Sequence, residues 1–377
     1  MSEEWGRIET RALDRQPLTI GIEGDRVSMS PRPEAAHVFD FSRARVAAGL
    51  IDLQVNGGYG EDFTSDPESI WRVGSLLPRH GVTAFLPTII TSASEVAQHT
   101  IEVMRVGPPP GYRGARVLGI HFEGPLLAPD RRGTHPEQLL RTPDRSLISG
   151  WSKDAGVVMV TLAPELPGAE AIVRELAANG VVVAAGHTSA TYEEAKAGFS
   201  WGISHVTHLF NAMPPLDHRS PGLIGALIAD PQVTAGLIVD GYHSHPSVVT
   251  GAWRWLEPDR LALVTDAMAA AGMGDGEFQI GTVPVNVTAG RVTNRDGRLA
   301  GSTLTLDQAV RNLIAYSGCS ESEALAAASS VPARIIGRVD LGRIEIGELA
   351  DLTFFDDHLN VVGTMIGGEV VWRRDTP

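Results

Sequence analysis

Residues 117–123 read VLGIHFE, a strand-like apolar run that ends on the acidic side chain of Glu123. Three further runs end in the same way, each followed by a side chain that can bind a metal ion or carry a proton. They are Val181 to Gly186 before His187, Ile203 to Thr207 before His208, and Leu261 to Thr265 before Asp266. In (β/α)₈ barrels the catalytic residues lie at the carboxyl ends of the strands. The pattern therefore predicts such a barrel and a metal-dependent hydrolase.

Eight strand-like runs alternate with helix-patterned stretches along the middle of the chain, and eight is the number that closes a barrel. The runs are 50 to 56, 82 to 88, 117 to 123, 157 to 163, 181 to 186, 203 to 208, 235 to 240 and 261 to 266. Between two of them, residues 169 to 179 carry Ile172, Val173 and Leu176 at helical spacing, and Gly180 follows as a stop. The alternation predicts an α/β fold with a parallel, TIM-like barrel.

The two ends of the chain have a different texture, with short apolar runs broken by glycines in residues 17 to 48 and 343 to 377. We expect both ends to form one small β-sandwich domain, made of residues 1–48 and 343–377, beside a barrel of residues 49–342. Between Gly274 and Gly301, residues 278–280 and 283–287 predict a hairpin excursion after the eighth strand. Such an excursion lies where it can cover the active site.

Composition limits the classes of partner. The chain has 377 residues, 43% of them hydrophobic and 20% charged, and a net charge of −14. That charge opposes binding to nucleic acid or to anionic membranes. No stretch approaches the roughly 20 apolar residues that span a bilayer, and Glu3 and Glu4 stand where a signal peptide carries positive charge. Because the lone Cys319 also agrees with a reducing compartment, we expect a cytoplasmic protein.

The strand-end residues fit the chemistry of amide hydrolysis. Glu123, His187 and His208 supply the three carboxylate and imidazole ligands of a catalytic zinc site, which keeps one position for water. Asp266 can accept a proton from that water and return it to the departing amine. His135, in Gly133-Thr134-His135, is a candidate donor to the substrate carbonyl as negative charge develops on its oxygen.

Each of these residues also has an ordinary structural explanation. A single strand-end histidine is more often hydrogen-bonded than metal-bound, and a strand-end aspartate often caps the next helix. His135 fits a simple surface turn, and Arg219 and His243 fit exposed loops. Four suitable residues at four strand ends nevertheless favour a common site.

Several motifs together are similar to one known enzyme family. They are HFEGP at 121–125, GTH at 133–135, AGHT at 185–188, THLFNAM at 207–213 and VTDA at 264–267. Further agreement lies in GLID at 49–52, LAGS at 299–302 and GELADL at 347–352. The chain resembles the N-acetylglucosamine-6-phosphate deacetylase family of the amidohydrolase superfamily, from about residue 47 to residue 356.

The resemblance implies deacetylation of N-acetyl-D-glucosamine 6-phosphate to D-glucosamine 6-phosphate and acetate, in amino-sugar catabolism. It implies that Glu123, His187 and His208 are metal ligands and that Asp266 is the acid and base. The substrate-binding residues that it implies are His135, Asn211, Ala212, Arg219 and His243, with Arg219 reaching the phosphate across a homodimer interface. A phosphate dianion near a chain of charge −14 needs such local donors.

One departure from the wider superfamily bears on the number of metal ions. Where other members often carry a His-x-His pair on the first strand, this chain has Gln54 and Asn56. Neutral amides are poorer ligands than imidazole for such an ion. We expect one divalent ion per subunit, with Zn²⁺ as the default and Fe²⁺, Mn²⁺ or Co²⁺ as alternatives.

Two other functions stay open at this stage. One is hydrolysis of another N-acyl amino sugar, a cyclic amide or an aminated base, because fold alone does not specify the substrate. Arg219 and His243 discriminate here, since an uncharged substrate has no use for them. The other is a non-catalytic barrel that serves as a scaffold, although such a protein is expected to lose its ligands or its base first.

Overall fold

The computed structural model describes residues 5–28 and 37–375. Residues 1–4, 29–36 and 376–377 of the predicted terminal domain lie outside this range. Eight parallel strands form the centre of the molecule, each hydrogen-bonded to the next in chain order. They are β5 (Leu50–Val55), β8 (Val82–Ile90), β10 (Ile120–Glu123), β11 (Val157–Leu162), β12 (Val182–Ala185), β13 (Ile203–Val206), β14 (Thr234–Leu237) and β15 (Leu261–Leu263). All eight predicted strands are present, and the parallel barrel is confirmed.

The first and last strands meet just beyond the end of β15. The Asp266 amide donates to the Gln54 carbonyl at 2.9 Å, and the Asn56 amide donates to the Ala267 carbonyl at 2.7 Å. Val55 and Ala267 form a parallel bridge there. This seam nearly closes the barrel and places the end of the eighth strand against the first.

The third predicted strand, 117 to 123, differs from the structure in one respect. It is split into β9 (Arg116–Val117), which pairs with β8, and β10. The interruption falls at Gly119, whose φ of +132° is rarely adopted by other residues. A Cβ atom at this position would lie 2.4 Å from Val158 Cγ2, so the close approach of the neighbouring strand also requires glycine.

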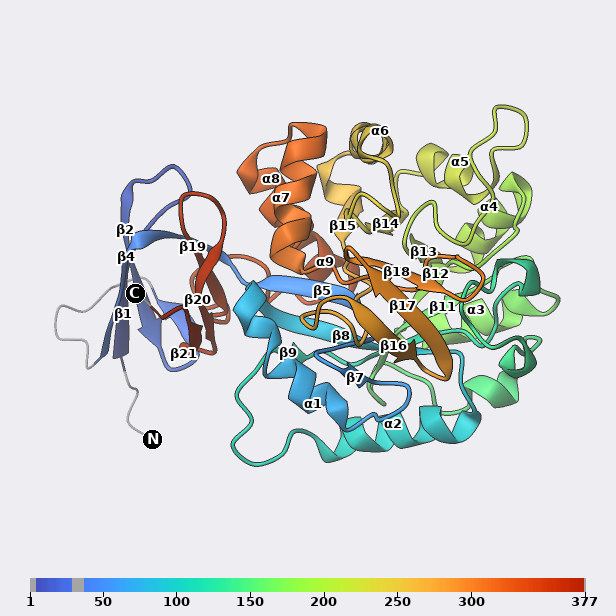
Figure 1. Cartoon of the computed structure of the whole chain (residues 1–377), viewed down its shortest axis with the longest axis horizontal. Coiled ribbons are helices and arrows are strands. Elements are labelled where there is room, and N and C mark those ends of the chain that lie inside the picture. The colour runs from blue at the N-terminus through green and yellow to red at the C-terminus, as the bar shows by residue number, and fades with distance from the viewer. Residues whose placement is uncertain (1–4, 29–36, 376–377) are drawn as a thin grey trace.

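Helices surround the barrel in the order that the alternating pattern predicts (Figure 1). They are α1 (Ser69–Gly74), α2 (Ser94–Val106), α3 (Ala169–Ala178), α4 (Tyr192–Trp201), α5 (Gly222–Ala229), α6 (Pro246–Leu256), α7 (Leu306–Ser317), α8 (Glu321–Ala327) and α9 (Ser330–Ile335). In α3 the apolar face of Ile172, Val173 and Leu176 is buried, as predicted, and Gly180 follows with φ +76°. Of the described helices, none has the length and apolar character needed to cross a membrane.

Both ends of the chain contribute to a separate β unit beside the barrel, at the left of Figure 1. Its strands are β1 (Trp5–Arg11), β2 (Pro17–Glu23), β3 (Arg26–Ser28), β4 (His37–Ala48), β19 (Leu352–Phe355), β20 (Val361–Ile366) and β21 (Glu369–Arg373). They form one continuous sheet, because the long β4 pairs with β1 through its first half and with β19 through its last residues. Phe41 stacks on Phe354, with ring centroids 3.8 Å apart, in the core that both ends share.

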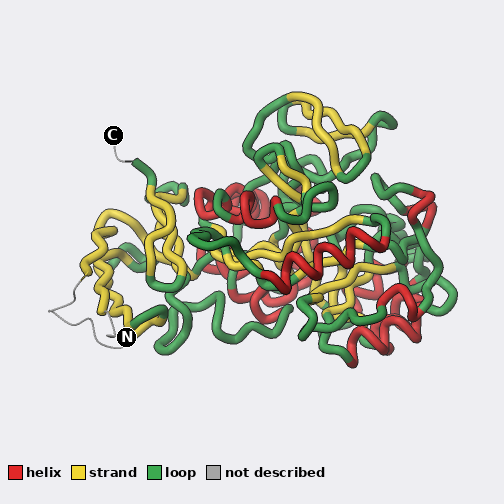
Figure 2. Tube along the Cα trace, turned by 90° about the horizontal axis from the view of Figure 1, so that it is seen from below, coloured by secondary structure: helices red, strands yellow, loops and turns green. Residues whose placement is uncertain are grey.

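The excursion after the eighth strand is a three-stranded antiparallel sheet of β16 (Gly276–Ile280), β17 (Val283–Thr288) and β18 (Arg291–Asn294). Only the first two strands are predicted from the sequence. The third forms because Ala289 and Gly290 both have positive φ, 52° and 78°, which turns the chain back on itself. This sheet projects from one end of the barrel (Figure 2) and packs its apolar face on Ile90 and Met268.

Candidate active site

The four predicted strand-end residues gather at one end of the barrel. Glu123 is the last residue of β10, and His187 and His208 each follow the end of their strand by two residues. Asp266 follows β15 by three residues. His187, His208 and Asp266 have left-handed backbones, with φ of 49°, 29° and 50°, a conformation that costs energy in non-glycine residues and that clusters at functional sites.

Glu123, His187 and His208 form a compact group with metal-ligand geometry. The Nε2 atoms of His187 and His208 lie 3.1 and 3.0 Å from Glu123 Oε1 and 3.0 Å from each other. Ligands at about 2.0–2.1 Å from a tetrahedral ion lie about 3.3 Å apart, so an ion fits among these atoms with small adjustments. The spacing and chemistry of Glu123, His187 and His208 therefore fit a divalent cation.

Neighbouring groups prepare two of these side chains as ligands. The Nδ1–H of His187 donates to the Arg131 carbonyl at 2.8 Å, which leaves the Nε2 lone pair for an ion. Burial raises the pKa of the Glu123 carboxyl, but the neighbouring rings of His187 and His208, in their protonated forms, outweigh burial by hydrogen bonding and hold that pKa well below its usual value. Glu123 is therefore anionic, which is the form that can bind a cation.

His135 lies beside this group, and its nitrogen, Glu123 and His187 also come within 4.8 Å of one another. Its Nε2 atom is 3.7 Å from Glu123 Oε2. The Thr91 backbone N–H, however, donates to His135 Nδ1 at 3.2 Å, so the proton of the neutral ring is on Nε2. Burial lowers the pKa of His135 to about 3, which keeps the ring neutral. His135 thus presents an N–H donor to the cavity and is poorly prepared as a ligand.

Asp266 has the environment of an acid and base that works near neutral pH. Its side chain is buried, and Oδ1 accepts a hydrogen bond from Asn56 Nδ2 at 2.7 Å. Burial, followed by the nearby charge of Glu123, raises the pKa of Asp266 to about 6. A general base is most effective when its pKa lies close to the working pH.

Gln54 and Asn56 are hydrogen-bond donors to the acidic groups of the site. Gln54 Nε2 donates to Glu123 Oε1 at 3.2 Å, just as Asn56 donates to Asp266. Their amide N–H groups therefore face the positions where a His-x-His pair would present lone pairs to a further ion. The two amides at the end of the first strand therefore orient the carboxylates of Glu123 and Asp266.

The metal-ligand group opens into a cavity of about 400 Å³, within the usual range for small-molecule sites. Its lining contains eight of the nine predicted site residues: Glu123, His135, His187, His208, Asn211, Ala212, His243 and Asp266. His243 is held by Asp240, whose Oδ2 accepts from His243 Nδ1 at 2.6 Å. Arg219 is the exception, because it lies exposed on the loop before α5 and does not line this cavity.

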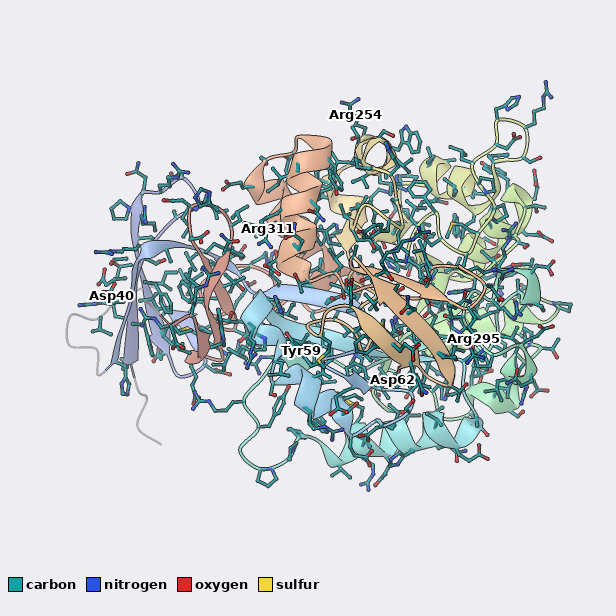
Figure 3. All side chains as sticks on the ribbon, viewed as in Figure 1. Asp40, Tyr59, Asp62, Arg254, Arg295 and Arg311 are labelled. Carbon is teal, nitrogen blue, oxygen red and sulfur yellow. The ribbon has the colours of Figure 1, made fainter. Side chains whose placement is uncertain are left out.

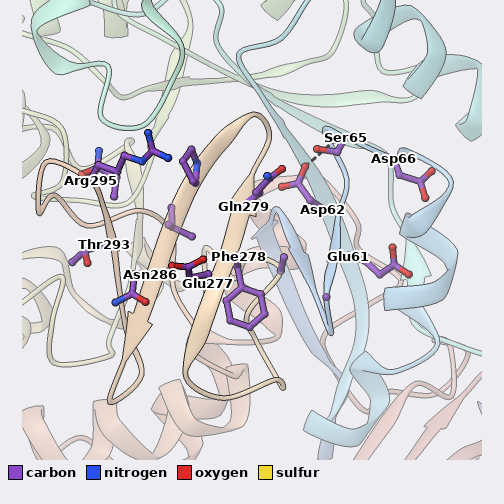
Figure 4. A pocket seen from close by; sticks show the side chains of 15 residues that line it. Glu61, Asp62, Ser65, Asp66, Glu277, Phe278, Gln279, Asn286, Thr293 and Arg295 are labelled. Carbon is purple, nitrogen blue, oxygen red and sulfur yellow. Dashed lines mark hydrogen bonds between the residues drawn. The ribbon is translucent and has the colours of Figure 1, made fainter.

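Two arginines at the cavity are not predicted from the sequence, whereas the excursion lies at the site as expected. Arg131 and Arg298 line the cavity, and Ile280 brings the tip of the excursion into its wall. The only signal for Arg298 is its place directly before the Leu299–Ser302 motif. A larger cavity of about 700 Å³ lies between the excursion and residues 60–66, and none of the predicted site residues lines it (Figure 4).

Known proteins share both the sequence and the architecture. The model of the amidohydrolase family matches residues 45–371. An N-acetylglucosamine-6-phosphate deacetylase from Danio rerio is 39% identical over 360 residues, which cover 90% of this chain and 87% of that protein. The crystal structure of N-acetylglucosamine-6-phosphate deacetylase from Pasteurella multocida aligns with a TM-score of 0.89 at 30% identity, over 97% of this chain and 99% of that one. A mutant of the Mycobacterium smegmatis deacetylase in complex with N-acetyl-D-glucosamine-6-phosphate aligns with a TM-score of 0.86 at 34% identity, over 98% and 100% of the two chains.

Proposed function

This chain belongs to the amidohydrolase family, and we propose that it hydrolyses the acetamido group of N-acetylglucosamine 6-phosphate to give glucosamine 6-phosphate and acetate. The observation that carries this conclusion is that the proposed metal ligands Glu123, His187 and His208 line the same cavity as Asp266, the proposed base. The identity of the substrate is inferred from the deacetylases to which the chain is similar, because the structure of one of them contains N-acetyl-D-glucosamine-6-phosphate.

A single divalent ion per chain is part of the proposal, with zinc as the expected metal. Glu123, His187 and His208 would hold the ion, which supplies an activated water and polarises the amide carbonyl when bound. The amides of Gln54 and Asn56 donate to Glu123 and Asp266, which supports one ion rather than two. Metal analysis of purified protein is expected to give one tightly bound ion per chain. Two ions, both needed for turnover, would contradict this count.

The side chains divide the proton transfers of the reaction between them. The Asp266 carboxylate takes a proton from the water that attacks the amide carbon, and gives it to the nitrogen as the carbon–nitrogen bond breaks. The His135 Nε2–H donates to the carbonyl oxygen while negative charge develops on it. Asn211 and Ala212 contact the sugar through the backbone, and His243 contacts the sugar phosphate.

A homodimer and a cytoplasmic location complete the proposal. Arg219 is exposed on a loop away from the cavity of its own chain, which supports a role in the cavity of a second subunit. We expect Arg219→Ala to raise KM mainly for the phosphorylated sugar. The net charge of −14 and the metabolic substrate agree with a location in the cytoplasm.

The deciding experiment measures acetate release from N-acetylglucosamine 6-phosphate and from unphosphorylated N-acetylglucosamine, with protein that contains one equivalent of zinc. Strong preference for the phosphorylated sugar is expected. If folded, metal-loaded protein turns over neither sugar, the substrate is another amide. Equal turnover of both would remove the phosphate contacts from the proposal.

A further inference from the structure

Two arginines of the same chain line the catalytic cavity, and they differ in whether their side chains have partners. Arg131 donates from Nε to Ser189 Oγ at 3.1 Å, and its backbone carbonyl holds His187. The exposed side chain of Arg298 makes no hydrogen bond or ion pair with any residue in 5–28 or 37–375. Arg298 is therefore a cation at the cavity wall whose guanidinium donors are available to a ligand.

The backbone on both sides of Arg298 is held in place. Before it, the Asn294 side chain accepts hydrogen bonds from the amides of Asp296 and Arg298, both at 3.0 Å, and closes a tight turn. After it, the Ser302 amide donates to the Asp266 carbonyl at 2.8 Å, and Ser302 bridges Ala267. Arg298 is thus four residues from a segment that is hydrogen-bonded to the backbone of the catalytic base.

This segment also requires a glycine where it passes Asp266. Gly301 has φ +64°, and a Cβ atom there would lie 3.1 Å from the Asp266 carbonyl oxygen. The chain between Arg298 and Ser302 therefore lies directly on the end of the eighth strand. The Arg298 backbone is thus held from one side by the Asn294 turn and from the other by the contact of residues 301 and 302 with Asp266, while its side chain is exposed.

The place of Arg298 in the barrel is one where phosphate groups are often bound. Phosphate sites in (β/α)₈ barrels are frequently formed by the loops after the seventh and eighth strands. His243 lies on the loop after β14, the seventh strand, and Arg298 lies in the segment after β15, the eighth. Both line the same cavity. A chain of charge −14 offers little general attraction to a dianion, so a local guanidinium matters more.

We propose that Arg298 is a specificity-determining residue that binds the phosphate of the substrate from within the same chain. The inference rests on the proposed function, and it adds a phosphate contact that does not depend on a second subunit. A guanidinium can donate two parallel hydrogen bonds to phosphate oxygens, which a neutral sugar hydroxyl cannot match. Arg298 therefore distinguishes the phosphorylated from the unphosphorylated sugar.

The test compares Arg298→Gln and Arg298→Lys with a matched control, Arg295→Gln. Arg295 is exposed in the same turn region but faces the larger cavity between the excursion and residues 60–66 (Figures 3 and 4). Loss of a charge-assisted contact is expected to raise KM for N-acetylglucosamine 6-phosphate about tenfold or more in Arg298→Gln, with kcat changed little. Arg298→Lys should recover part of the loss, and Arg295→Gln should behave as the parent.

A binding measurement separates this inference from the proposed function. Calorimetry with glucosamine 6-phosphate is expected to give an affinity about tenfold weaker for Arg298→Gln than for the parent, and unphosphorylated glucosamine should not distinguish the two proteins. If the parent deacetylates the phosphorylated sugar but KM and product affinity are unchanged in Arg298→Gln, Arg298 has no such role. If the parent deacetylates neither sugar, the proposed function itself is wrong.

Discussion

At the level of single residues, Asp266 offers the most direct test of the mechanism. Asp266→Asn keeps the shape of the side chain, and its Oδ1 can still accept from Asn56, which now donates at 2.7 Å. The amide cannot accept the proton of the attacking water, so kcat should fall by about 10²–10⁴. The measurements are steady-state turnover, metal content and thermal unfolding. Unchanged turnover would remove Asp266 from the mechanism, and lost metal or lost stability would make the variant uninformative about proton transfer.

His135 and His187 differ in which ring nitrogen carries the proton, and this difference predicts different losses. His135→Ala removes an N–H donor aimed at the substrate, so kcat should fall by about 10²–10³ while the ion is retained. His187→Gln removes a ligand, and metal affinity itself should fall by more than the 10–100-fold typical of residues that only orient ligands. Metal analysis after dialysis, combined with kcat, separates the two. Loss of the ion from His135→Ala would assign His135 to the ligand set with Glu123 and His187.

At the level of elements, the strands are predictable because a barrel strand buried on both faces is an apolar run that ends sharply. Glu123, His187, His208 and Asp266 are predictable for the same reason, since each directly follows such a run. The interruption at Gly119 is not predictable, because it depends on the approach of Val158 from the neighbouring strand.

The excursion shows a second limit of the sequence pattern. Its third strand pairs because Ala289 and Gly290 both adopt a positive φ, and alanine does not signal this conformation as asparagine or glycine would. Arg298 follows this strand in a polar stretch of sequence, and nothing in that stretch indicates that Arg298 lines the cavity. The place of Arg298 at the cavity depends on the tertiary structure, in which the Ser302 amide donates to the Asp266 carbonyl.

The seam between the first and last strands makes stability depend on pH. Asp52 on β5 accepts from Thr265 Oγ1 at 2.6 Å and from the Thr265 amide at 3.2 Å. Burial raises the pKa of Asp52 to about 7, from a usual value of 3.8. Between these values the folded chain binds a proton that the unfolded chain releases. This group therefore contributes stability at acid pH that is lost as the pH rises towards 7 and above.

Asp52→Asn should remove that dependence. The Asn oxygen can keep the two backbone N–H bonds that Asp52 Oδ1 now accepts, and its NH₂ can donate to Thr265 Oγ1, which then donates to the Gln54 carbonyl. Between pH 5 and pH 8 the variant should lose less free energy of unfolding than the parent, by roughly 1–3 kcal/mol. Urea unfolding of both metal-loaded proteins at the two pH values measures this difference. Parallel pH profiles would show that Asp52 does not titrate as inferred.

At the level of the whole molecule, the terminal sheet is joined to the barrel by hydrogen bonds and ion pairs. Arg116 before the third barrel strand pairs with Asp351 at 2.8 Å, and Thr353 and Thr364 donate to the carbonyls of Gly81 and Pro78, both at 2.7 Å. Arg45 of β4 also forms an ion pair with Glu321 of α8. The terminal sheet lies at the side of the barrel (Figure 1), so it leaves the open end of the barrel to the excursion and the loops.

The exposed loop before α5 gives the whole-molecule prediction. It carries Arg219, which is exposed and lies away from the cavity of its own chain. If Arg219 enters the site of a second subunit, a hybrid dimer of one Asp266→Asn chain and one Arg219→Ala chain contains one complete site. That site combines Asp266 of the second chain with Arg219 of the first.

Co-expression with two different affinity tags allows the hybrid to be isolated, and its activity can be measured at substrate concentrations below KM. Because one of its two sites is complete, the hybrid should recover about half of the parent activity per dimer, while both homodimers stay slow. Arg219 acting within its own chain predicts no recovery, because the only chain with Asp266 then lacks its arginine. Elution of the parent as a monomer would exclude the shared site altogether, and Arg298 would then be the arginine at the cavity with a free side chain to bind the phosphate.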